Sequence, residues 1–398
     1  MIELNNLKRL KKKAMEIKDT RVTGRCTYKL WDVVVLTILA ILANAQDWKE
    51  IEMFGNTYKK YLRQFLKLTG GIPPAKTIEN IISTVNSSEL TKITLEFIND
   101  VCYKQYNAKQ EILSFDGRVN KGSKKNKTYN SEKIKPLNVL NVYSSEYGMC
   151  IEQEIINEKT NEIPAIPVLL ERLNIKDVIC TWDALNTQKS NVEAVIKNGG
   201  NYVVPIKGNH KNFKKDIADY FDEDVCNIIK SGYEGSYLCE REKSHNKIIT
   251  YEYYQTEKIT WFEEYKEWKG LKSFIYVSKK MEDLVTGEIK KEKRYYISNL
   301  LLNINQVSLA IRNHWQVENK LHWHLDFTFK LDDNKMLNKK ALFNFEIMTK
   351  LCLKILNIAK REYNLSLKKI RYQISLNVEK ELNNIFKILA SQKDTIKI

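Results

Sequence analysis

Histidines gather around one glutamate in the stretch from Arg312 to Phe329, which reads RNHWQVENKLHWHLDFTF. This stretch holds three of the five histidines of the chain. On an α-helix, His314, Glu318 and His322 are spaced four residues apart and share one face. A carboxylate between two imidazoles on one helix face indicates chemistry rather than packing alone. We therefore expect Glu318 to work with further groups that the rest of the chain supplies.

Two aspartates follow short apolar runs that look like buried strands. Asp116 ends the run 112–115 and precedes Gly117, and Asp183 ends the run 178–182. A strand fixes a carboxylate at its end, and a neighbouring glycine lets backbone or substrate approach closely. The same Asp-Gly pair is common in simple turns, which is the alternative interpretation of Asp116.

Asp116, Asp183 and Glu318 together could bind two Mg²⁺ or Mn²⁺ ions roughly 4 Å apart. In such a site one ion activates the attacking oxygen of a phosphodiester cleavage, and the other stabilises the leaving oxygen. Hard oxygen ligands suit these ions better than zinc. A zinc site on the histidines lacks a cysteine pair or an HExxH motif. Many other Asp and Glu residues could be chosen, so residue types alone do not fix this set.

Basic residues that could contact DNA phosphates follow Asp116, follow the strand-like run 202–206, and accompany Glu318 on its helix. For the group after 206, an exposed polar loop is the alternative. For the histidines near Glu318 we favour hydrogen bonds to phosphate, to Glu318 or to its neighbours, and the alternative is an ordinary histidine at a helix interface. The candidates for a DNA-binding or a supporting role are Arg118, Lys121, Lys124, Lys125, Lys207, His210, Arg312, His314 and His322.

The elements that must position these groups fall into three parts. Residues 1–105 are typical of an all-helical unit, which could bind DNA or serve as a structural or dimerisation module. Residues 106–210 and 299–398 mix strands with helices and end in helices, which predicts an α/β core with a mixed sheet. Residues 211–298 look like a β-rich insertion. Strands are expected there at 248–255, 272–277 and 293–297.

Composition favours a nucleic-acid partner. The 398 residues include 65 Lys and Arg against 49 Asp and Glu, a formal charge of +16. That excess favours a polyanion, nucleic acid before a membrane surface, although a basic protein without such a partner is the alternative. The seven cysteines are scattered without a CxxC motif, which favours a reducing cytoplasm. We expect no secretory signal, and the most apolar run, 33–45, is shorter than the roughly 18 residues of a membrane span.

The three carboxylates stand within longer motifs, FDGRVNKGS, then TWDALNTQ with KNGGNYVVPIKGN, then RYYISNL with HWQVENKLHWHLDFTF. Upstream lie GRCTYKLWDVVVLTILAILANAQDWKEIEMFG and GIPPAKT. In this order and spacing, over nearly the whole chain, they resemble a DDE transposase of the bacterial insertion-sequence type, in the H-repeat-associated group. The resemblance implies that Asp116, Asp183 and Glu318 are the catalytic, metal-binding residues.

The resemblance also implies a fold and an activity. We expect an RNase H-like core with a β-rich insertion, preceded by a helical domain and followed by C-terminal helices. The expected activity is excision and strand transfer of a DNA element with two Mg²⁺ or Mn²⁺ ions, by a homodimer on DNA in the bacterial cytoplasm, associated with the nucleoid. The alternatives are a transposase-derived DNA-binding protein that no longer cuts and a metal-dependent nuclease that does not join.

The sequence departs from the better-known insertion-sequence relatives near the glutamate. Those relatives carry an Arg one turn before it and a Lys about two turns after it, where this chain has His314 and Leu325. Leu331 stands where the group tends to have an acid. All three metal carboxylates remain, so we expect an intact core.

Overall fold

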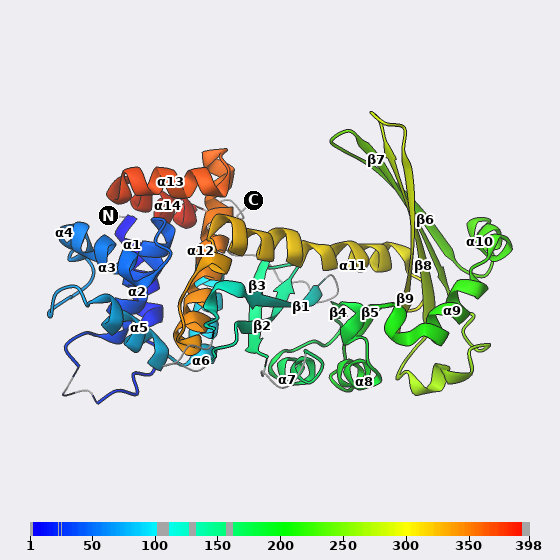
Figure 1. Cartoon of the computed structure of the whole chain (residues 1–398), viewed down its shortest axis with the longest axis horizontal. Helices are drawn as coiled ribbons and strands as arrows, with labels where there is room; N and C mark the ends of the chain where they lie inside the picture. The colour runs from blue at the N-terminus through cyan, green and yellow to red at the C-terminus, as the bar shows by residue number, and fades with distance from the viewer. Residues whose placement is uncertain are drawn as a thin grey trace.

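A nine-stranded mixed sheet runs through the described part of the molecule (Figure 1). The computed structural model describes residues 3–22, 24, 26–101, 111–126, 133–156 and 162–391. The strand order is β3-β2-β1-β4-β5-β9-β8-β7-β6. The strands are β1 (Ile112–Asn120), β2 (Leu137–Ser144), β3 (Met149–Ile155), β4 (Ile179–Trp182), β5 (Asn201–Ile206), β6 (Ser236–Ser244), β7 (Lys247–Thr256), β8 (Ser273–Asp283) and β9 (Ile289–Ser298).

The first five strands form the RNase H-like core expected from the sequence. β1, β2 and β3 pair antiparallel, whereas β4 and β5 continue the sheet parallel to β1. Helices α7 (Ala165–Arg172) and α8 (Lys189–Lys197) cover one face through one apolar cluster. Helix α11 (Ile304–Gln316) covers the other face and packs across β1, β4, β5, β6 and β7.

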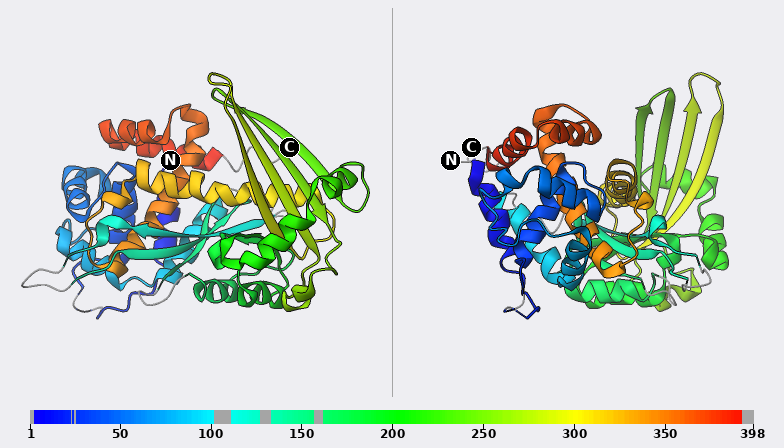
Figure 2. Two further views of the ribbon diagram at one scale, coloured as in Figure 1. Left: turned by 45° about the vertical axis from the view of Figure 1, so that its right-hand side comes forward. Right: turned by 60° about the vertical axis from the view of Figure 1, so that its left-hand side comes forward.

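The insertion extends this sheet rather than forming a separate layer. β9 pairs antiparallel with β5, and β8, β7 and β6 follow. The halves of β8 and β9 next to the core are buried and mostly apolar, while the other half of β8 is half-buried and that of β9 is exposed and rich in lysine. These strands therefore project beyond the body of the molecule (Figures 1 and 2). The three expected strands are confirmed within β7, β8 and β9, whereas β6 was not predicted. Helices α9 (Lys211–Tyr220) and α10 (Glu223–Lys230) also lie in the insertion.

Helices from both ends of the chain share a second core. The C-terminal helices, which the sequence grouped with the catalytic core, pack chiefly against the N-terminal helices (Figure 2). The apolar run 33–45 lies within this packing, and α2 is buried along almost its whole length. The helices are α1 (Glu3–Ala14), α2 (Leu30–Leu42), α3 (Trp48–Thr57), α4 (Lys59–Leu62), α5 (Ala75–Thr84), α6 (Ser87–Val101), α12 (Lys339–Tyr363), α13 (Leu367–Leu376) and α14 (Val378–Ser391).

Membrane-spanning helices were searched for among the described residues. None of the helices there combines the length and the apolar character that a membrane crossing requires.

Candidate active site

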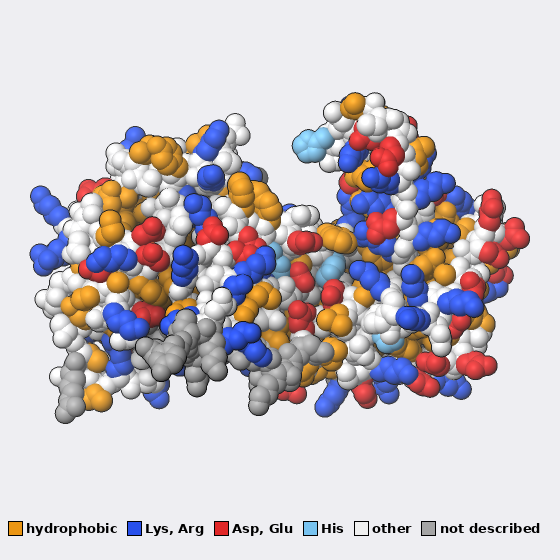
Figure 3. Space-filling view, viewed as in Figure 1, with side chains coloured by type: hydrophobic (Ala, Val, Ile, Leu, Met, Phe, Trp, Pro, Cys, Tyr) orange, Lys and Arg blue, Asp and Glu red, His pale blue; other side chains and the backbone are white. Residues whose placement is uncertain are grey.

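A surface cleft of about 980 Å³ lies between the helices around Asp332 and the insertion strand β9. Figure 3 shows this hollow in the middle of the face, with acidic and histidine side chains at its floor. Asp116, Asp183 and Glu318 all line the cleft, although they come from three separate elements. The structure thus brings the three carboxylates singled out from the sequence to one place.

Asp116 lies in the middle of β1, so its predicted position at a strand end is wrong. The strand continues to Asn120 because β2 pairs with it along that length, with Asn141 opposite Asp116. The Asp116 side chain is 28% exposed, and its Oδ2 lies 3.2 Å from Nδ1 of His322. The apolar run correctly marked where the strand begins, but it carried no information on how far the pairing extends.

Asp183 follows β4 directly, as predicted, and caps the short 3₁₀ turn Ala184–Asn186. Its Oδ1 accepts a hydrogen bond from the backbone N–H of Asn186 at 3.1 Å. The preceding residues, Phe115 and Trp182, are register partners in the parallel pair β1–β4, and their rings pack edge to face. Asp116 and Asp183 are therefore the next residues on two neighbouring strands, which explains why they reach the same cleft.

Glu318 lies on a π-helical segment, Val317–His322, that follows α11. The predicted continuous α-helix is therefore wrong beyond Gln316. A π-helix bonds residues five apart instead of four, so the four-residue spacing no longer defines one face. Glu318 is exposed in the cleft, whereas His322 is 8% exposed. π-Helical segments of this kind are frequent at functional sites.

The two histidines of the cleft have different surroundings. His322 touches Asp116 rather than Glu318, and its Nε2 lies 3.2 Å from Nδ2 of Asn141. His314 lines the cleft, and its Nδ1 is buried without a hydrogen-bond partner among the described residues. Burial lowers the pKa of His314, while the charges of Asp116 and Asp183 act in the opposite direction. His314 is accordingly neutral at pH 7.

Exposed cations border the carboxylates. Lys207, directly after β5, is exposed and lines the cleft. Lys121 lines it as well and forms an ion pair with Asp332 at 2.9 Å. Arg294 on β9, which the sequence analysis did not single out, lies with its guanidinium 4.8 Å from the ring centre of Trp315. Cationic side chains thus line the cleft from both the core and the insertion, and Arg294 is paired with Glu292 at 2.8 Å.

Two known families match the chain. Residues 13–98 match the DDE_Tnp_1-associated family, and residues 107–355 match the transposase DDE domain. The chain belongs to the DDE transposase family.

Two similar proteins of Escherichia coli carry transposase names. The "H repeat-associated putative transposase YhhI" of Escherichia coli K12 is 31% identical to this transposase over 361 residues, which cover 88% of this chain and 90% of that protein. The "Inactive transposase YbfQ" of the same strain is 35% identical over 77 residues, 19% of this chain and 92% of that protein. A solved piggyBac transposase synaptic complex with hairpin DNA aligns over 100% of this chain and 82% of that chain, with a TM-score of 0.39 and 10% identity.

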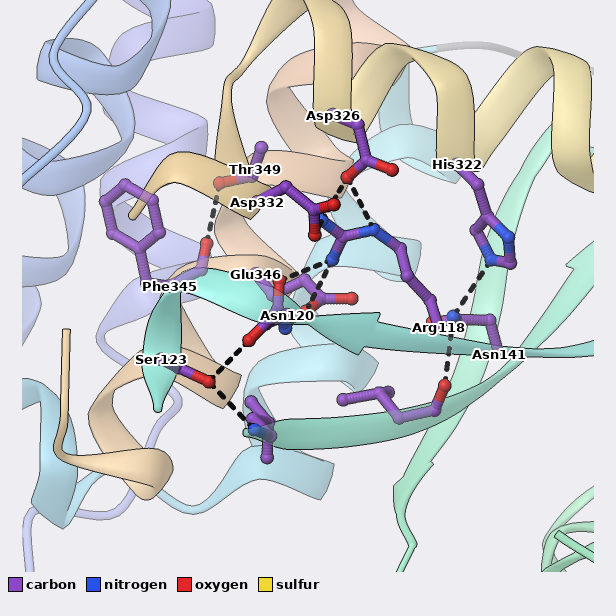
Figure 4. A network of polar contacts seen from close by, with 12 residues as sticks. Arg118, Asn120, Ser123, Asn141, His322, Asp326, Asp332, Phe345, Glu346 and Thr349 are labelled. Atoms are coloured by element: carbon purple, nitrogen blue, oxygen red, sulfur yellow. Dashed lines mark hydrogen bonds and ion pairs between the residues drawn. The ribbon is translucent and has the colours of Figure 1, made fainter. Parts of the chain in front are cut away.

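Arg118 of the transposase is buried rather than placed at the surface to meet DNA. Its side chain is 4% exposed. Figure 4 shows it surrounded by acidic partners from three segments. Its Nε donates to Asp326 at 2.9 Å, and its other nitrogens lie 3.4 Å from Asp332 and 3.5 Å from Glu346. Arg118 therefore supports the wall of the cleft from within.

Four further candidates do not line the cleft. Lys124 and Lys125 are exposed beyond the end of β1. His210 is half-buried, and its Nε2 lies 2.7 Å from the carbonyl oxygen of Thr187. Arg312 faces the insertion, where it forms ion pairs with two glutamates of β6. The sequence placed these residues near the carboxylates along the chain, but the fold directs them elsewhere.

Glu162, which the sequence did not single out, contacts β1 beside Asp116 and the turn that follows Asp183, outside the lining of the cleft. Its carboxylate packs against Gly117, and its Oε2 accepts a hydrogen bond from Asn186 at 2.6 Å. Burial raises the pKa of Glu162, and the charges of Asp183 and Asp116 raise it further. No local pattern marks this residue, because the contact depends on how the segment before α7 folds over β1.

The donor chemistry of the cleft fits a divalent cation. Within the described ranges, no three His, Cys, Asp or Glu side chains form a ready-made metal-binding group. Mg²⁺ seldom requires one, since it binds through one or two carboxylates, keeps several waters and completes its shell with substrate phosphates. The carboxylates of Asp116, Asp183 and Glu318 suit such an ion.

Proposed function

We propose that this transposase cuts DNA at the ends of a mobile element and joins the freed ends to target DNA. The observation that carries the proposal is that Asp116, Asp183 and Glu318 line one cleft, which Lys207 and Arg294 also line. Carboxylates suit a divalent cation, and the flanking cations suit the phosphates of a DNA strand. The net charge of +16 favours the same partner.

Each proposed step forms one P–O bond and breaks another. In cleavage, water forms a bond to phosphorus, the bond to the 3′ oxygen breaks, and a 3′-hydroxyl and a 5′-phosphate remain. In joining, that 3′-hydroxyl attacks a phosphodiester of the target, and the 3′ oxygen of the target strand leaves. In-line displacement at one site accounts for both steps without a covalent enzyme intermediate.

The residues of the cleft would divide the work. Asp116, Asp183 and Glu318 would hold two Mg²⁺ or Mn²⁺ ions, which activate the attacking oxygen and stabilise the leaving oxygen. His322, 3.2 Å from Asp116, would keep that carboxylate in its orientation. Lys207 and Arg294 would bind backbone phosphates beside the scissile one and so fix the strand in the cleft.

Cleavage assays with matched variants test this proposal. The substrate is a labelled duplex that carries the inverted repeat flanking the gene, incubated with Mg²⁺. We expect wild type to release a cut strand and a joined product, and Asp116→Asn and Glu318→Gln each to lower cleavage by more than about 100-fold. Glu193→Gln, on the exposed side of α8, should cut like wild type.

The same assay separates the alternatives. Binding of the duplex without cleavage by wild type would instead indicate a transposase-derived DNA-binding protein. Cleavage without a joined product would indicate a metal-dependent nuclease. If Asp116→Asn or Glu318→Gln cuts as fast as wild type, the assignment of the three carboxylates is wrong.

A further inference from the structure

We propose that Glu162 is a fourth carboxylate of the catalytic centre, which holds the Asp116 strand against the Asp183 turn and strengthens cation binding there. The proposal rests on the function proposed above. Glu162 lies in the segment before α7, outside the three motifs that carry Asp116, Asp183 and Glu318.

The contact between Glu162 and β1 requires a residue without a side chain at position 117. A Cβ built on Gly117 would lie 1.9 Å from Oε1 of Glu162. That distance is far below van der Waals contact, so any larger residue would push the carboxylate away. The backbone of Gly117 is in an ordinary strand conformation, since it is not among the glycines with positive φ. Space for Glu162, rather than conformational freedom, is therefore what this glycine provides beside Asp116.

A hydrogen-bonded bridge connects Glu162 to Asp183. The Asn186 side chain donates from Nδ2 to Glu162 at 2.6 Å, and the Asn186 backbone N–H donates to Asp183 at 3.1 Å. Asn186 is completely buried, and its Oδ1 has no hydrogen-bond partner among the described residues. Because both donors of this bridge belong to one fully buried residue, Asn186 holds Glu162 and Asp183 in fixed positions relative to each other.

The charges around Glu162 explain why it would matter for a cation. Asp116 and Asp183 both act on the Glu162 carboxyl, and they disfavour its ionised form. Carboxylates held this close repel one another until a cation is shared between them. The affinity of such sites for divalent ions rises with the number of negative ligands and the rigidity of the site. Glu162 contributes to the charge and to the rigidity of the site, because it adds a carboxylate and connects β1 to the turn that follows Asp183.

The test is Mn²⁺ binding to the full-length protein without DNA, measured by isothermal titration calorimetry. Glu162→Gln keeps the shape and can still accept the Asn186 hydrogen bond, but it removes the charge. We expect its Kd for Mn²⁺ to be about 10-fold higher than that of wild type. Gly117→Ala should weaken binding as well by displacing Glu162, and Glu162→Asp should lie between Glu162→Gln and wild type. Glu171→Gln, an exposed position on α7, is the matched control.

Each outcome decides the proposal. Thermal unfolding checks the fold of the variants, and Gly117→Ala serves if Glu162→Gln does not fold. Weaker Mn²⁺ binding with an unchanged melting temperature supports the proposal. Wild-type affinity in folded Glu162→Gln overturns it and leaves the proposed function standing, provided that Asp116→Asn still loses Mn²⁺. A wild-type protein that binds no Mn²⁺ without DNA overturns this proposal, whereas the proposed function stands or falls with the cleavage assay.

Discussion

A chain of hydrogen bonds connects buried Lys350 on α12 to Asp116 in the cleft. Lys350 donates to Oδ1 of Asn141, which places Nδ2 of Asn141 toward His322. An amide Nδ2 can only donate, so Nε2 of His322 must accept and the ring proton must lie on Nδ1. That proton faces Oδ2 of Asp116 at 3.2 Å. This series of hydrogen bonds therefore fixes the tautomer of His322, whose Nδ1–H is directed at Asp116.

His322→Ala should lower DNA cleavage by about 10- to 100-fold, because groups that orient a metal ligand typically have effects of this size. DNA binding should stay unchanged, since His322 is buried. The measurement is single-turnover cleavage beside a binding titration. His324→Ala is the control, because His324 bonds to Thr328 and does not line the cleft. Cleavage within twofold of wild type would mean that other contacts suffice to orient Asp116.

At the residue scale, the sequence predicted which residues form the candidate site better than it predicted the contacts that they make. Asp183 could be placed because a short buried strand ends immediately before it. The partner of His322 could not, because its assignment to the Glu318 face assumed an α-helical period that the π-helical segment breaks. Glu162 could not be found either, since its contacts with Gly117 and Asn186 are made across the fold.

Among the elements, α12 connects the helical part to the sheet through buried charges. Glu346 is fully buried and pairs with Lys350 at 2.8 Å and with Arg118 at 3.5 Å. Asn120 at the end of β1 donates to it at 2.8 Å. Removing one charge of such a buried set leaves the others uncompensated. The position of β1, and with it Asp116, therefore depends on α12.

Glu346→Gln should lower the free energy of unfolding at pH 7 by about 3 kcal/mol, the size expected when one partner of a buried ion pair is lost. Urea denaturation measures this value. Glu362→Gln, the same substitution at an exposed position of α12, should change it by less than about 0.5 kcal/mol. Equal stability of the two variants would show that Glu346 adds nothing to the connection.

The difference in unfolding free energy between wild type and Glu346→Gln should also depend on pH. Burial alone would raise the pKa of Glu346, but the charges of Lys350 and Arg118 outweigh it and lower the pKa from its ordinary 4.5 to about 2. A carboxyl group whose pKa is lower in the folded than in the unfolded state stabilises the protein at pH values above the unfolded-state pKa. This stabilisation is lost as the pH falls through the folded-state pKa. The difference in unfolding free energy should be complete at pH 5 and shrink between pH 4.5 and 2. A difference that stays constant over this range would contradict the ion pair.

Helix α11 and strand β6 meet through Arg312, which the sequence placed among the DNA contacts. Its guanidinium lies 3.3 Å from Glu240 and 2.5 Å from Glu242, and 5.1 Å from the ring centre of Tyr251. These contacts hold the insertion against α11. Lys207, in contrast, is exposed and lines the cleft.

Arg312→Ala and Lys207→Ala should therefore differ. Lys207→Ala should reduce the slope of the logarithm of the DNA-binding constant against the logarithm of the salt concentration by about one, as expected for a lost phosphate contact. Arg312→Ala should leave that slope unchanged. It should raise proteolysis in β6 and β7 by up to about fivefold, since a part-exposed ion pair contributes at most about 1 kcal/mol. A reduced slope for Arg312→Ala would restore it as a DNA contact.

The elements themselves followed from the sequence more closely than their packing did. Apolar runs predicted β1, β4 and β5, since strands buried on both faces need continuous apolar residues. β6 was missed because its residues are mostly half-exposed and charged, so it shows no apolar run. The packing of α12, α13 and α14 on the N-terminal helices joins segments more than 200 residues apart, and no local pattern carries that information.

At the scale of the whole molecule, the cleft is open on one face between the helical part and the insertion (Figure 3). The exposed half of β9, which is rich in lysine, extends the basic surface away from it. A DNA duplex bound along this face would meet positive charge on both sides of the carboxylates.

The number of protein chains in the DNA complex follows from the number of catalytic sites that each chain can form. Each chain brings together one set of Asp116, Asp183 and Glu318, so it can act on one scissile phosphate at a time, whereas an element has two ends. We therefore expect a complex of two chains with two end duplexes. Light scattering coupled to size-exclusion chromatography, with Glu318→Gln to prevent cleavage, measures its mass. Two duplexes bound by a single chain would contradict the prediction, and mixing a Glu318→Gln chain with wild type should leave one of two differently labelled ends uncut.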